Sequence, residues 1–188
     1  MRVRRSIRIL LASVTLVLTG FISYANGQDT KQSTQTMSGR DDMQDQKMTD
    51  RGDHVMGFDH TKTTHHFRLL KDGGLIEVTA NASEDTESRD QIRMHLSHIA
   101  KMFAEGNFKA PMLIHEQVPP GVPTMQKLKS EIQYTFEQTQ QGALIRILSK
   151  NPEALQAIHD FLRFQISEHK TGDSLELDRN HVNAAVRP

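Results

Sequence analysis

The chain has 188 residues with 23 basic and 23 acidic side chains, ten histidines and no cysteine. The lack of cysteine excludes disulfides, thiolate metal sites, thiol catalysis and c-type haem attachment. Histidine and methionine are therefore the nitrogen and sulfur ligands that remain for a metal ion, and the balanced charge does not suggest a nucleic-acid partner.

The first 27 residues predict an export signal peptide. Four arginines at positions 2, 4, 5 and 8 precede an apolar run over residues 9–22, and Ala25-Asn26-Gly27 forms a small-x-small cleavage site. The run is short for a membrane span, so an uncleaved anchor is the less favoured alternative. Cleavage leaves 19 basic and 23 acidic residues, a formal charge of −4. We expect a periplasmic or extracellular protein with no stable membrane insertion after signal cleavage and no nucleic-acid partner.

Composition predicts one folded domain between two loose ends. Residues 28–54 contain no Leu, Ile, Val or aromatic residue, so they cannot bury enough apolar surface to offset their ordering entropy. We expect this segment to be a disordered linker and residues 173–188 to be a flexible tail. Residues 55–172 then form a single domain of ordinary size.

Two β-prone runs predict a hairpin. His65–Leu70 and Leu75–Ala80 flank Lys71-Asp72-Gly73-Gly74, which is typical of a tight turn. Apolar and polar residues alternate in both runs, as in a sheet with one buried face. A helix follows, with Ser83 or Asp85 as its N-cap and Gly106 at its end. Its buried stripe consists of Ile92, Leu96, Ile99 and Phe103.

The same order of elements then repeats. Strands are expected over Glu131–Glu137 and Ala143–Leu148, and Asn151-Pro152 predicts the start of a helix that runs to about His169. The predicted fold class is α+β: two ββα units form one mainly antiparallel sheet with two helices on one face.

A proline-rich segment separates the two units. Residues 107–130 contain Val118-Pro-Pro-Gly-Val-Pro123, and these prolines predict a rigid loop without regular helix. A loop of this length is often functional in a small domain. A structural crossover between the two units is an equally good interpretation.

Several strings of this sequence resemble a family of short exported bacterial proteins. They are MGFDHTKTTHHF, KDGGLIEVTA, RDQIRMHLSHIAKMF, PPGVP and IHDFLRFQI, and the resemblance covers residues 56 to 173. Members of this family are sometimes labelled aspartate carbamoyltransferase. This sequence does not support that activity, because such transferases are longer, two-domain cytosolic enzymes with a Ser-Thr-Arg-Thr phosphate-binding segment. The resemblance implies a family but no site residues.

The first long helix carries the best metal-ligand pattern. His95, His98 and Met102 fall on one narrow stripe at about 100° per residue. Imidazole and thioether together suit a soft ion such as Cu(I). The alternative is a row of amphipathic residues at the boundary of the core.

The stretch FDHTKTTHHF holds three further histidines. His65 and His66 are adjacent on a strand and point to opposite faces, so at most one of them joins a site. We place His65 with the helix ligands and keep His60, His66 and His115 as alternates. A polar strand edge is the simpler interpretation of the stretch. His115 and Glu116 are weak candidates for a catalytic acid–base pair.

These features predict three functions. The leading hypothesis is a periplasmic metal-binding protein for copper or zinc. The second is a non-catalytic module that binds a peptide or protein partner through the Pro-rich loop. The third is a small His/Glu acid–base enzyme, which is least favoured because no phosphate loop, nucleophile elbow or zinc signature is found.

Overall fold

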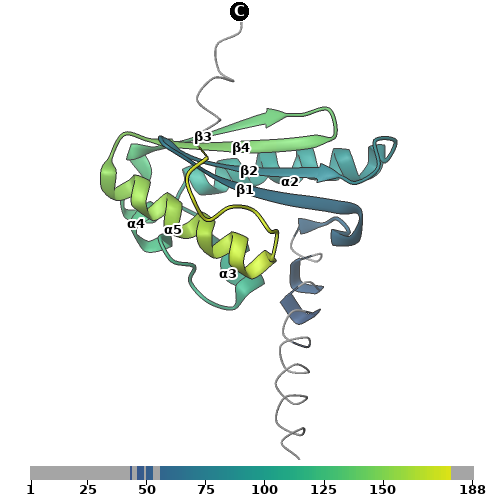
Figure 1. Ribbon diagram of the computed structural model, residues 1–188, viewed down its shortest axis with the longest axis horizontal. Helices are drawn as coiled ribbons and strands as arrows, with labels where there is room; N and C mark the ends of the chain where they lie inside the picture. The colour runs from purple at the N-terminus through teal and green to yellow at the C-terminus, as the bar shows by residue number, and fades with distance from the viewer. Residues whose placement is uncertain (1–42, 44–45, 49, 53–55, 179–188) are drawn as a thin grey trace, which may run out of the picture.

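The fold consists of one antiparallel sheet and two long helices. Figure 1 shows the computed structural model, which describes residues 43, 46–48, 50–52 and 56–178. The sheet has the order β1-β2-β4-β3, so the predicted α+β class with one antiparallel sheet is confirmed. The main elements are β1 (Thr63–Leu70), β2 (Gly73–Ala80), α2 (Thr86–Ala104), β3 (Ile132–Gln138), β4 (Gly142–Ser149) and α5 (Pro152–His169).

Two glycines let the central strands β2 and β4 approach each other closely. Gly73 begins β2, and a Cβ at this position would collide with the carbonyl oxygen of Ile147 on β4. Gly142 begins β4, and a Cβ there would collide with the carbonyl oxygen of Val78 on β2. A glycine without a Cβ therefore permits close strand contact at each end of the β2–β4 pairing, where the two ββα units join.

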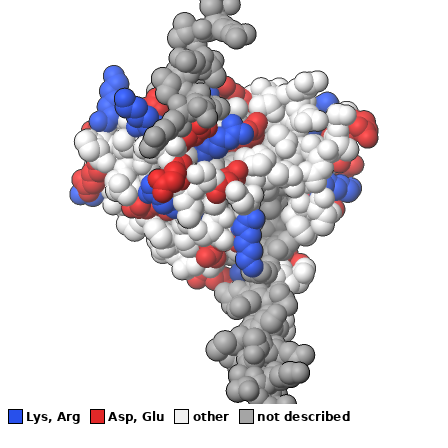
Figure 2. Space-filling model, viewed as in Figure 1, with Lys and Arg blue, Asp and Glu red and all other residues white. Residues whose placement is uncertain are grey.

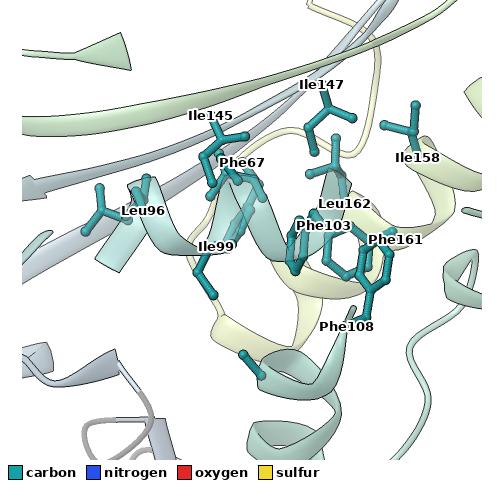
Figure 3. Close-up of a cluster of buried hydrophobic side chains, with 14 of the residues drawn as sticks. Phe67, Leu96, Ile99, Phe103, Phe108, Ile145, Ile147, Ile158, Phe161 and Leu162 are labelled. Atoms are coloured by element: carbon teal, nitrogen blue, oxygen red, sulfur yellow. The ribbon is translucent and has the colours of Figure 1, made fainter. Parts of the chain in front are cut away.

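Each long helix packs mainly on the hairpin of the other unit. α2 lies chiefly against β3 and β4, whereas α5 lies against β1 and β2. Neither unit can bury its own apolar stripe alone, so the two units form a single core. Figure 3 shows aromatic rings in this core, where Phe103 stacks on Phe108 at 4.4 Å between centroids and Phe161 meets both rings edge-on.

The prediction of a loop without regular helix over residues 107–130 is wrong. The segment forms α3 (Lys109–His115), α4 (Val122–Lys127) and a short 3-10 turn, Lys129–Glu131. Pro111 and Pro123 lie in the first turns of α3 and α4, where a backbone N–H has no partner within the helix, so proline is tolerated.

Polar contacts tie both flanking segments to the domain. The described residues 46–48 and 50–52, in the expected linker, are helical, and Arg51 Nε donates a hydrogen bond to the Ile114 carbonyl at 2.9 Å. In the expected tail, the N–H of Asp178 donates to the Leu69 carbonyl at 2.8 Å. The predicted signal peptide, residues 28–42 of the predicted linker and residues 179–188 of the predicted tail lie outside the described residues. In the described chain no helix is long and apolar enough to span a membrane.

The outer face of the sheet carries cross-strand ion pairs. Arg68 pairs with Glu77 at 3.3 Å, and Arg146 pairs with Glu137 at 3.4 Å. Figure 2 shows basic and acidic side chains interspersed on the face in view, without a large patch of one sign. The helix-covered face is mainly apolar, and the few polar side chains that lie on it are therefore candidates for a functional site.

Candidate functional site

A small, partly open cavity lies between the sheet and helices α2, α3 and α5. Its volume is about 80 Å³, and its walls are mainly apolar side chains such as Phe67, Ile99 and Phe161. The polar groups that line it are His65, His95, Gln165 and His169. Three histidines that are far apart in the sequence thus meet at one cavity.

A second, more polar depression adjoins this cavity. It has a volume of about 250 Å³ and includes Met48, His60, Thr64 and Thr171 among its lining residues. Met56, His65 and His169 line both spaces, so these three side chains form the wall between them. The arrangement offers a route from outside to the histidines.

His65 and His169 face each other across the junction of β1 and α5. Their ring centroids are 5.8 Å apart, and the ring planes differ by 9°. His65 shares the core face of β1 with Phe67, as strand alternation requires. His66 points away and contacts Asp173 Oδ1 through Nδ1 at 2.9 Å.

Burial keeps the cavity histidines uncharged. It lowers the pKa of His65 to about 4, with further repulsion from His95 and His66. Burial likewise lowers the pKa of His95 to about 4 and that of His169 to about 3, with additional repulsion from neighbouring histidines. In the described part of the chain, no hydrogen bond involves a ring nitrogen of these three residues. Each neutral imidazole therefore has a lone pair free for a ligand.

Only part of the predicted ligand set comes together. His95 lines the cavity beside His65, and its ring lies edge-on to Phe58 at 5.5 Å. His98 is exposed, and Met102 packs against the core without lining the cavity. α2 turns its apolar stripe to the sheet, so His98 lies about 60° further from the core than His95.

The predicted alternates occupy separate places. His60 lines the outer depression, and His66 lies on the other side of β1. His115 is buried next to the cavity, with its ring edge-on to His169 at 5.1 Å. Its Nε2–H donates to Gln165 Oε1 at 3.2 Å, and its Nδ1 lies 3.9 Å from Glu168 Oε2.

The structure does not bring His115 and Glu116 together. Glu116 ends α3 in the left-handed backbone region at φ 53°. Its carboxylate is 67% exposed and pairs with Arg51 at 3.3 Å, whereas the His115 side chain is fully buried. The nearest carboxylate to His115 is that of Glu168, which an inspection of sequence neighbours does not reveal.

Sequence reasoning missed Met56, Gln165 and His169. A signal for His169 existed, because it follows Leu162 and Ile166 at i, i+4 and i+7 and so continues the buried stripe of α5. Gln165 lies within the same stripe, one position before Ile166. A polar residue within an otherwise apolar buried stripe is therefore the sequence signal that indicates a functional site of this kind. Met56 follows residues 53–55, which lie outside the described chain, and no periodic pattern marks it.

The site offers few ligands, and they are soft or borderline. Within the described residues, no three His, Asp or Glu side chains are gathered closely enough to hold an ion. The wall provides two neutral imidazoles and one thioether, and no carboxylate of the described chain lines either space. Comparison with known proteins finds no matching family model, no similar curated protein and no similar solved structure.

Proposed function

We propose that the protein binds one Cu(I) ion at the wall between the two spaces. His65 and His169 would supply nitrogen ligands, and Met56 would supply sulfur. The observation that carries the proposal is the pair of neutral imidazoles, free of hydrogen bonds, with centroids 5.8 Å apart. The rings are near-parallel, so at least one of them would have to turn for both to reach one ion through metal–nitrogen bonds of about 2.0 Å.

The lining favours a soft, singly charged ion. Mg²⁺ and Ca²⁺ require several oxygen ligands, and among the described residues no Asp or Glu lines the cavity or the depression. A divalent ion would leave two uncompensated charges beside apolar walls, whereas Cu(I) leaves one. Zn²⁺ prefers four ligands, while Cu(I) is stable with two or three and suits imidazole with thioether.

The size of the cavity argues against an organic ligand. Pockets for such ligands are usually about 300–1,000 Å³. The cavity has about 80 Å³, which is well below this range. An ion with one small companion fits this space, whereas an organic cofactor does not.

His95 is assigned a supporting place in this site. It lines the same cavity, and the ring of Phe58 contacts both His65, at 6.0 Å, and His95, at 5.5 Å. A shift of that ring would let His95 add a third nitrogen. The predicted export signal would place copper binding in the periplasm or outside the cell.

Copper binding is tested by thermal unfolding of the mature chain with and without Cu(I). At a free ion concentration of 100 times Kd, binding stabilises the native state by about 2.7 kcal/mol. That raises the melting temperature of a domain of this size by about 10 °C. His169→Ala should abolish the rise, and His98→Ala, on the exposed side of α2, should retain it. A wild-type protein that shows no rise with Cu(I) would end the proposal.

A further inference from the structure

An open edge of the sheet runs along β1, and a later segment of the same chain lies beside it. Among the described strands, β1 pairs only with β2, so its other side has no neighbouring strand. Residues 173–178, which we call the strap, follow α5 and run beside this edge, in yellow in Figure 1. Leu177 of the strap forms an isolated parallel bridge with Leu69. A bare strand edge is a template for pairing with a further chain, so the strap controls access to it.

A single carboxylate anchors the strap to β1. Asp173 Oδ2 accepts a hydrogen bond from the backbone N–H of Phe67 at 2.9 Å, where a neighbouring strand would present a carbonyl. Oδ1 of the same carboxylate lies 2.9 Å from His66 Nδ1. Because an ionised carboxylate only accepts, Nδ1 carries the proton in this contact. The edge of β1 therefore offers two donors, a backbone N–H and an imidazole N–H, to one carboxylate.

Two further contacts recognise the backbone of the strap. Arg163 Nε, on α5, donates to the carbonyl of Leu175 at 3.0 Å. The N–H of Asp178 donates to the carbonyl of Leu69 at 2.8 Å. In chain order, the edge thus receives a carboxylate, a backbone carbonyl and a backbone N–H. Any extended segment can supply the last two groups, and an acidic residue at the right position supplies the first.

The strap fits this edge incompletely. It advances from residue 173 to residue 178 while its contacts on β1 advance only from Phe67 to Leu69, whereas two regular parallel strands rise in step by about 3.3 Å per residue. A depression of about 400 Å³ lies between the strap and β1 and is lined by residues of both. Leu175 and Leu177 stay 46% and 42% exposed, so release of the strap uncovers little additional apolar surface from them. A segment that follows β1 in step would form more backbone hydrogen bonds than the strap does.

We propose that the edge of β1 binds an extended acidic segment of a partner protein and that the strap competes with this segment in the free protein. An Asp or Glu of the partner takes the place of Asp173 at the Phe67 N–H and His66. The partner backbone then adds a parallel strand to β1, and Arg163 donates to one of its carbonyls. This binding function goes beyond the proposed copper site and uses none of its ligands, so either proposal can fail without the other.

Fluorescence anisotropy with a labelled synthetic peptide tests this proposal. The peptide TGDSLELD has the sequence of residues 171–178 and serves as the probe. In the wild-type protein the strap competes at an effective concentration of about millimolar order, so the peptide binds weakly. In Asp173→Ala the strap loses its anchor, and the peptide should bind about tenfold more tightly or better. Glu176→Ala, at an exposed strap position, is the matched control and should bind as weakly as wild type. The peptide TGASLELD, which lacks the carboxylate, should lose this gain.

Amide hydrogen exchange locates the bound peptide. The Phe67 N–H should exchange about tenfold faster in Asp173→Ala than in wild type, and the peptide should restore its protection. Absence of peptide binding to Asp173→Ala, or binding that leaves Phe67 unprotected, would overturn the proposal. A wild-type dimer that the peptide dissociates would also overturn it, because the edge then serves a second copy of this chain. Should Asp173→Ala not fold, Asp178→Pro removes the donor to Leu69 and should show the same gain in peptide affinity.

Discussion

Asp173 fastens the chain that leaves α5 to β1: its Oδ2 accepts a hydrogen bond from the backbone N–H of Phe67 at 2.9 Å. The same carboxylate contacts His66 Nδ1 at 2.9 Å and accepts from Thr171 Oγ1 at 2.7 Å. These contacts lie within four positions after His65 and His169 in the sequence. They therefore hold the two imidazoles at their separation.

Asp173→Ala should lower both stability and copper affinity. Loss of three hydrogen bonds to a partly buried carboxylate should cost about 1–3 kcal/mol in urea unfolding. The Cu(I)-dependent rise in melting temperature should also shrink, because the end of α5 loses its attachment to β1. Glu176→Ala, an exposed acidic residue in the same segment, is the control and should change neither quantity. Unaltered copper affinity in Asp173→Ala would show that the carboxylate does not position the histidines.

Acid should begin to destabilise the domain at pH values well above those at which carboxylates usually titrate. Burial lowers the pKa of His65 and His95 to about 4 and that of His169 to about 3, against an ordinary value of 6.5. Between these values the unfolded chain binds more protons than the folded one, so stability is complete above pH 6.5 and falls as pH decreases. Each of the three histidines loses about 1.8 kcal/mol over this interval, so we expect a total loss of roughly 5 kcal/mol between pH 7 and pH 5.

The matched variants for this pH profile are His169→Phe and His98→Ala. His169→Phe removes one buried titrating imidazole, so the slope of the free energy of unfolding against pH should decrease. His98 is exposed, and its replacement should leave the slope unchanged. A wild-type profile that is flat between pH 7 and pH 5 would mean that the imidazoles are not buried as described.

His159 is expected to be a structural histidine. Its Nε2–H donates to the carbonyls of Leu70 and Gly73 at 2.9 and 3.0 Å, which joins α5 to the turn between β1 and β2. His159→Ala leaves two buried carbonyls without this donor, so urea unfolding should show a loss of about 2–4 kcal/mol. Copper affinity should persist in the folded fraction, because His159 lines neither space.

The core stripe of α5 gives a prediction independent of the metal. Leu162 is fully buried, so Leu162→Ala should cost about 2–5 kcal/mol in the free energy of unfolding. Leu113 is 60% exposed, and Leu113→Ala should change the free energy of unfolding by less than about 0.5 kcal/mol. Equal effects of the two substitutions would contradict the assigned packing.

The sequence reveals local structure in this protein better than it reveals the site. Alternation along β1 and the Gly73-Gly74 turn predict the hairpin, because these signals depend on neighbouring residues. The prediction of a loop for the Pro-rich segment fails because proline position within a helical turn, not proline content, decides whether a helix forms. Segments held by a few polar contacts, such as those of Arg51 with Ile114 and Glu116, leave no compositional signal.

The site escapes prediction because it is created by the crossing of distant elements. Strand alternation correctly places His65 on the core face, and helix periodicity brings His95 toward the core. Neither pattern predicts that α5 packs over β1 and brings His169 next to His65. The separation of 104 positions between these two residues is bridged only by tertiary packing.

The most direct test of the proposed copper site is the X-ray absorption spectrum of the protein loaded with Cu(I). We predict two imidazole nitrogens at about 2.0 Å and one sulfur at about 2.3 Å from the ion. The signal of one imidazole should disappear in His169→Ala, whereas His98→Ala should give the wild-type spectrum. A copper shell without two imidazoles, or one that is identical in His169→Ala, would contradict the assignment of the His65–His169 pair as the metal site.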